Sequence, residues 1–87
     1  MKIKKGFVCR KVGGEHVVVP VGEMTKVFHG MINLNETGGF LWDYFADGGT
    51  KEGAVDALLA EYDVLKEDAI KDVDRFVSVL EKNGFLE

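Results

Sequence analysis

The chain has few of the residues that disulfides, metal sites and membrane spans require. Its 87 residues include one cysteine and two histidines, with no CxxC or HxxxH spacing. One cysteine excludes an intramolecular disulfide, and we therefore expect a cytoplasmic protein. No apolar run approaches the roughly 20 residues of a membrane-spanning helix. The basic N-terminus is followed by no long apolar segment of a secretion signal, so we expect no membrane partner.

Motifs for catalysis and cofactor binding are also missing. The three glycine pairs lack the Lys-Ser/Thr of a phosphate loop and the spacing of a dinucleotide site. The only cysteine and histidine side chains that could bind a metal ion are those of Cys9, His16 and His29. Cys9 and His16 would share a sheet face, but two ligands without a fixed third make a poor metal site. No nearby base would activate Cys9. We predict a protein that is not an enzyme, with no catalytic residue and no metal site.

The charges are unevenly distributed. The chain has 11 Lys and Arg against 15 Asp and Glu, a net charge of −4. Residues 1–14 carry five bases and no acid, so residues 15–87 carry six bases and fifteen acids, or −9. Proteins that bind nucleic acids gain most of their affinity by neutralising phosphates. An acidic body therefore argues against a nucleic-acid partner.

The first third of the chain has the pattern of a β-sheet. Residues 7–12 and 15–19 flank Gly13-Gly14, and glycines supply the positive φ angles of a two-residue hairpin turn. Pro20 should end the second strand or place it on an edge. After a connection of mixed character, residues 30–34 alternate as a third short strand. Ile32 and Leu34 share one of its faces, and Met31 and Asn33 the other.

The rest of the chain has the pattern of three helices. Asn35 should cap a helix over 36–46, and Thr50 should cap a second that ends near 62. A third is expected over 66–83, with Gly84 at its left-handed end, followed by residues that fold back as in a Schellman motif. The expected apolar stripes are Phe40, Leu41, Tyr44 and Phe45, with Trp42 to the side; Val55, Leu58, Leu59 and Tyr62; and Ala69, Ile70, Val73, Phe76, Val77 and Leu80.

Three short strands followed by three helices predict an α+β domain, with the helices packed on one face of a small antiparallel sheet. We find no linker or repeat, and predict a single domain over residues 1–87. Each sheet edge exposes unpaired backbone groups that an extended peptide can cap. The third strand is the better candidate, since it is short and contains no proline. On a helical wheel, Ile70 belongs to the centre of the third helix's core face, Phe76 to its border, and Val79 lies beyond that border. Phe76 is therefore expected in the core, whereas Val79 is either partial core or part of a binding strip.

Several segments in order resemble the PqqD-like family, which is named for a pyrroloquinoline quinone biosynthesis protein. The most specific stretch is Leu-Asn-Glu-Thr-Gly followed by Leu-Trp, within residues 34–42. The resemblance covers nearly the whole chain and includes Val18-Val19-Pro20-Val21-Gly22-Glu23, Gly30-Met31-Ile32-Asn33-Leu34-Asn35-Glu36-Thr37-Gly38, Phe40-Leu41-Trp42, Tyr62-Asp63-Val64, Asp72-Val73 and Gly84-Phe85-Leu86.

The resemblance implies a winged helix-turn-helix-like domain that acts as a peptide chaperone, a precursor-peptide recognition element. Such a domain binds the leader segment of a ribosomally made peptide and presents it to a modifying enzyme. In many members that enzyme is a radical S-adenosylmethionine protein with iron–sulfur clusters. The cofactors belong to the enzyme, so the small domain is expected to need none.

The resemblance also implies where the leader peptide binds. The leader adds as a strand beside the third strand, in the cleft against the third helix. The expected peptide-binding residues are Met31, Ile32, Asn33, Leu34, Asp72, Arg75, Phe76 and Val79. Asn35 is expected to cap the first helix, with Leu41 and Trp42 packed beneath it rather than on the peptide. Leu65 departs from the family pattern, because members often have a capping Ser, Thr or Asp there.

Two other functions remain open from the sequence. A winged helix would suit a DNA-binding regulator, although residues 66–83 hold five acids against four bases, unlike a basic reader helix. A structural protein could self-associate as a homodimer through the same open strand edge.

Overall fold

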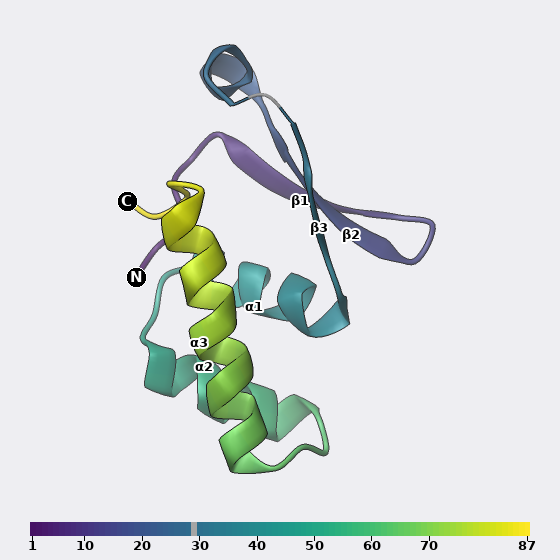
Figure 1. The fold of residues 1–87 in the computed structure, drawn as a ribbon, viewed down its shortest axis with the longest axis vertical. Helices are drawn as coiled ribbons and strands as arrows, with labels where there is room; N and C mark the ends of the chain where they lie inside the picture. Colours follow the sequence, from purple (N-terminus) through teal and green to yellow (C-terminus); the bar gives the residue numbers. More distant parts are fainter. Residues whose placement is uncertain (29) are drawn as a thin grey trace.

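The computed structural model describes residues 1–28 and 30–87, so His29 lies outside the described residues. Three strands, β1 (Phe7–Val12), β2 (Glu15–Pro20) and β3 (Ile32–Leu34), form an antiparallel sheet in the order β1-β2-β3. The helices α1 (Glu36–Ala46), α2 (Lys51–Glu61) and α3 (Lys66–Lys82) follow (Figure 1). The predicted α+β class, a three-stranded sheet followed by three helices, is confirmed.

The first hairpin has the predicted turn and register. Gly13 and Gly14 adopt φ angles of 58° and 89°, and Val12 pairs with Glu15 across the turn. The second strand ends at Pro20, as expected. The connection that follows contains a short 3₁₀ helix, η1 (Gly22–Lys26), which the sequence pattern did not indicate.

The third strand is shorter than predicted. It pairs with β2 over Ile32–Leu34 rather than over residues 30–34, so Met31 precedes the paired segment. Ile32 and Leu34 are partly buried against the core, whereas Asn33 is exposed. Their alternation agrees with the predicted division of faces.

The caps of α1 and α2 are those predicted. The Asn35 side chain accepts a hydrogen bond from the Gly38 backbone N–H at 2.8 Å, and the Thr50 hydroxyl accepts one from the Gly53 N–H at 3.0 Å. Each bond satisfies one of the backbone donors that a helix start leaves free. α3 begins at Lys66 behind Leu65, which provides no side-chain cap.

The buried faces of two helices differ from the predicted stripes. In α1, Trp42 is buried rather than to the side, because its ring packs on Phe85 with centroids 5.5 Å apart. In α3, Ile70 is 41% exposed and Phe76 only 6% exposed. The buried face of α3 is rotated toward Phe76 because α1 and α2 both pack against the helix. The wheel reading placed Ile70 at the centre of that face, which is wrong.

The end of α3 is a Schellman motif, as predicted. Gly84 has φ 68°. The Phe85 N–H donates to the Leu80 carbonyl at 2.9 Å, and the Gly84 N–H donates to the Glu81 carbonyl at 3.2 Å. The reversal turns Phe85 into the core, where its ring packs against the ring of Phe7.

The two ends of the chain lie side by side (Figure 1). The Lys4 N–H donates to the Phe85 carbonyl at 2.7 Å, and the Glu87 N–H donates to the Lys2 carbonyl at 2.9 Å. These bonds hold both termini against the core on the side away from the hairpin tip. No helix in the described part of the chain has the length and hydropathy needed to traverse a bilayer.

Candidate functional site

One edge of β3 has backbone groups that pair with no strand in the described part of the chain. Val12 and Glu15 flank a two-residue turn and so form a hydrogen-bonded pair. Successive residues of an antiparallel strand direct their N–H and C=O groups alternately to its two sides, so the backbone groups of Val17, like those of Glu15, face β1. Those of His16 and Val18 face β3, where their partners are Leu34 and Ile32. The same alternation predicts that the Val21 N–H faces the β1 side, and it donates there to the Gly6 carbonyl, just beyond the paired strands.

The intervening residue of β3, Asn33, therefore directs its N–H and C=O away from β2. Asn33 lies opposite Val17 in a pair that exchanges no hydrogen bonds. Among the described residues no strand pairs with this side of β3. An extended peptide laid here would meet one free donor and one free acceptor at Asn33.

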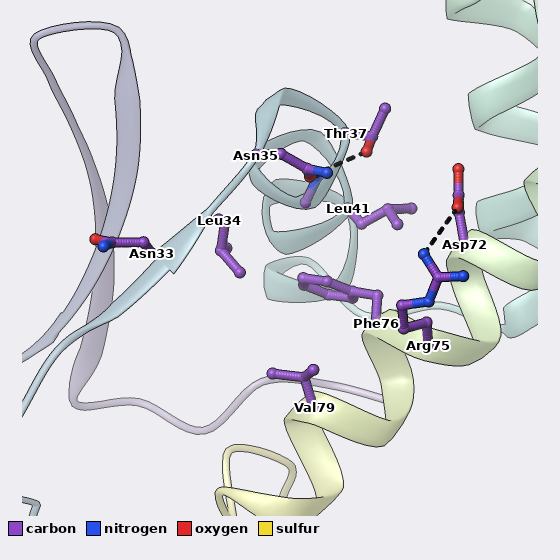
Figure 2. A pocket seen from close by; sticks show the side chains of 10 residues that line it. Asn33, Leu34, Asn35, Thr37, Leu41, Asp72, Arg75, Phe76 and Val79 are labelled. Atoms are coloured by element: carbon purple, nitrogen blue, oxygen red, sulfur yellow. Dashed lines mark hydrogen bonds and ion pairs between the residues drawn. The ribbon is translucent and has the colours of Figure 1, made fainter.

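A groove of about 280 Å³ runs between β3, the start of α1 and α3. Figure 2 shows Leu34, Leu41, Phe76 and Val79 directed into the same space, whereas the Asn33 side chain points away from α3. Leu41 and Phe76 are buried and form the floor. The complete lining is Asn33, Leu34, Asn35, Thr37, Gly38, Leu41, Asp72, Arg75, Phe76 and Val79.

The polar side chains of the groove come from α3 and from the start of α1. Asp72 and Arg75 form an ion pair at 3.8 Å across one turn of α3; the Arg75 side chain is largely exposed, whereas Asp72 is partly buried. At the start of α1 the Thr37 hydroxyl donates to Asn35 Oδ1 at 3.1 Å (Figure 2). Beside its apolar side chains the groove thus offers a carboxylate and a guanidinium on α3 and an amide at the start of α1.

Glycines at the start of α1 allow the helix to lie close to the sheet. A Cβ on Gly38 would lie 3.1 Å from the Leu34 Cβ. A Cβ on Gly39 would overlap the His16 ring of β2. The Gly38-Gly39 pair therefore sets the distance between α1 and the sheet, and with it the position of Leu34 at the groove.

Gly39→Ala is expected to destabilise the fold by about 1–3 kcal/mol, because the added methyl meets the His16 ring. In a His16→Ala background the same substitution should instead stabilise by up to about 1 kcal/mol, since alanine is the better helix former. Urea unfolding of the four proteins measures both values. An equal effect of Gly39→Ala in the two backgrounds would show that this contact does not limit the packing.

Six of the eight predicted peptide-binding residues line the groove. They are Asn33, Leu34, Asp72, Arg75, Phe76 and Val79. The other two do not: Ile32 packs against the core, and Met31 is 65% exposed ahead of the strand. That any of the eight binds a peptide remains a prediction.

Four lining residues were not among the predicted contacts. Asn35 and Leu41 were expected only to cap or support α1, yet both also line the groove, together with Thr37 and Gly38. All four lie in the Leu-Asn-Glu-Thr-Gly and Leu-Trp stretch. Because that stretch is the most specific part of the family resemblance, it was the sequence signal that could have assigned these four residues to the site.

The structure gives Cys9 little reactivity. Burial, and secondarily the negative charge of Asp43, raise the pKa of the Cys9 thiol, so the thiolate is disfavoured at neutral pH. Within residues 1–28 and 30–87, no group of three or more His, Cys, Asp or Glu side chains is placed to hold a metal ion.

The fold is shared with two solved peptide complexes. One is described as "TbiB1 in Complex with the TbiA(beta) Leader Peptide"; it is 26% identical, with a TM-score of 0.77, and the match covers 100% of this chain and 95% of that one. The other is "Lasso peptide synthetase B1 complexed with the leader peptide", at 22% identity and a TM-score of 0.72, covering 95% and 92%. The second likeness concerns the fold alone.

No curated protein sequence matches the chain at a significant level. A family model does match it, over residues 15–86, and that family is described as coenzyme PQQ synthesis protein D, PqqD. The match begins at the first residue of β2 and includes β3, all three helices and every residue that lines the groove. The chain therefore belongs to the PqqD family.

Proposed function

We propose that this chain is a non-catalytic carrier that captures the leader segment of a ribosomally synthesised precursor peptide and presents it to a modifying enzyme. The observation that carries the proposal is the unpaired edge of β3 beside an apolar groove. It is supported by the likeness to TbiB1, a protein solved with a leader peptide.

The leader would add to the sheet as a fourth strand. Its backbone would exchange hydrogen bonds with the N–H and C=O of Asn33, and alternate side chains would enter the groove. Burying each apolar side chain against Leu34, Phe76 and Val79 contributes about 1.5–3 kcal/mol. Ordering the peptide opposes this gain. We expect a Kd near the micromolar range, which corresponds to about −8 kcal/mol.

Residues 1–87 would act as one peptide-recognition domain in the cytoplasm. The modifying enzyme would be a radical S-adenosylmethionine protein whose iron–sulfur clusters carry the chemistry, as the family resemblance implies. The carrier itself would contribute no cofactor, only the position of the peptide.

An NMR titration tests the proposal. The neighbourhood of this chain's gene is first searched for a short precursor-peptide gene, and a synthetic leader of that precursor is then added to the isotope-labelled protein. Amide signals of residues 31–34 and 72–79 should shift in a saturable way. Shifts confined to the β1–β2 hairpin would place the peptide elsewhere and refute the proposed groove, and no shifts at all would refute leader capture.

Val79→Asp should weaken leader binding by about tenfold or more, because a carboxylate would replace an apolar wall of the groove. The matched control is Ser78→Asp, which adds the same charge at an exposed neighbouring position of α3. Isothermal titration calorimetry gives both Kd values, and circular dichroism confirms that each variant is folded. Equal affinities for the two variants would exclude Val79 from the site.

Self-association through the β3 edge is a second candidate function, since the same free groups of Asn33 could pair with a second copy. A homodimer of this kind would compete with the leader for one edge. Light scattering over a concentration series distinguishes them. A monomer that binds leader supports the carrier, whereas a dimer that the leader leaves intact supports the structural protein.

A further inference from the structure

The residue before α3 contributes neither a cap nor core packing. Leu65 is the N-cap of α3, yet its side chain makes no capping hydrogen bond and is 65% exposed. A Ser, Thr, Asp or Asn at this position would satisfy a free backbone N–H of the helix and stabilise it. Folding alone therefore gives no reason for a leucine here.

Further apolar surface lies beside it. Val64 and Ile70 are exposed, and Ile70 borders a hollow of about 160 Å³ between α2 and α3. Val55 forms the apolar part of the α2 side. The hollow can hold one side chain of a partner, and Leu65 directly precedes Lys66 on its rim.

Negative charge surrounds these residues. Glu52 and Asp56 line the hollow from α2, opposite Lys66. Residues 51–68 contain six carboxylates against two lysines, and Lys51 is already engaged by Asp74 at 3.5 Å. A partner that docks here would gain from lysines or arginines around a protruding aliphatic side chain.

This surface is separate from the peptide groove. Ile70 and Val79 are nine residues apart on α3, which at 100° per residue places them on opposite sides of the helix. A protein bound at the hollow would leave the groove open.

We propose that Leu65, Ile70 and the hollow between α2 and α3 form the docking surface for the modifying enzyme, which meets it with a basic surface and an aliphatic side chain. This inference rests on the proposed function. Leu65 and the five residues that line the hollow are far fewer than the roughly 20–30 residues per partner of a standard stable interface. So small a surface suits the transient contact of a carrier that delivers peptide and departs, rather than a permanent homodimer.

The test uses Leu65→Ser and the enzyme that modifies the precursor whose leader this chain binds. Serine supplies the missing cap, so the melting temperature should rise by roughly 4–8 °C. The Kd for the enzyme, measured by biolayer interferometry with leader present, should weaken about tenfold, while leader affinity stays unchanged. Ile70→Gln should weaken enzyme binding similarly, and added salt should weaken that of the wild type.

The matched control is Val12→Asp, at an apolar residue of the hairpin tip that is similarly exposed, at 61%, which should leave enzyme binding unchanged. Leader binding is measured first, so its absence refutes the proposed function itself. If leader binds but the enzyme binds wild type and Leu65→Ser equally, or does not bind the chain, the docking surface is refuted. A self-association that Leu65→Ser abolishes while enzyme binding persists would assign the surface to a second copy and also overturn the proposal.

Discussion

Asn33→Pro is expected to reduce leader affinity by more than about tenfold while leaving the sheet intact. Proline has no backbone N–H, and its ring would occupy the side of β3 on which a guest strand must lie. Asn33 exchanges no hydrogen bond with Val17, so the β2–β3 ladder loses nothing. A lost backbone hydrogen bond contributes about 0.5–1.5 kcal/mol, and the blocked approach of the peptide adds to it.

The matched control is Asn33→Ala, which removes the side chain but keeps the backbone donor. Because the Asn33 side chain points away from α3 (Figure 2), this variant should bind leader within a few-fold of the wild type. Calorimetry gives both Kd values, and circular dichroism monitors folding. If the proline variant binds as tightly as the alanine variant, strand addition at β3 is excluded.

Phe85→Ala is expected to cost about 3–5 kcal/mol of unfolding free energy, a large part of the 5–15 kcal/mol typical of a small domain. Phe85 is buried, and its ring contacts Phe7, Phe28 and Trp42 at centroid distances of 4.5, 5.4 and 5.5 Å. Its removal leaves a cavity where the sheet, α1 and the end of α3 meet.

Urea unfolding followed by the fluorescence of Trp42, the single tryptophan, measures this cost. Leu86→Ala is the matched control, because Leu86 is the neighbouring residue and only partly buried. It should cost clearly less than Phe85→Ala. A cost below about 1 kcal/mol for Phe85→Ala would show that the C-terminal reversal does not contribute to the core.

Most of the fold could be predicted because its signals are local. Gly13-Gly14 determines the hairpin register, Asn35 and Thr50 mark two helix starts, and Gly84 marks a helix end. The buried face of α3 could not be predicted, because it depends on which neighbours pack against the helix. The wheel therefore placed Ile70 inside, whereas α1 and α2 pack so that Phe76 is the buried residue.

The candidate site could be predicted only where its residues follow from local sequence patterns. The edge strand and the α3 strip follow from patterning, and six predicted residues line one groove. The contributions of Asn35 and Leu41 to its lining depend on how closely α1 approaches the sheet. That distance is set by the contact between Gly39 and His16, which are 23 positions apart in the sequence. Local patterns carry no signal for it.

The most direct test of the central claim is amide hydrogen exchange at the three residues of β3. In the free protein, the N–H groups of Ile32 and Leu34 should be protected by β2, and that of Asn33 should exchange rapidly. Saturating leader peptide should slow exchange at Asn33 by tenfold or more. Unchanged rapid exchange at Asn33 in a saturated complex would contradict strand addition at this edge.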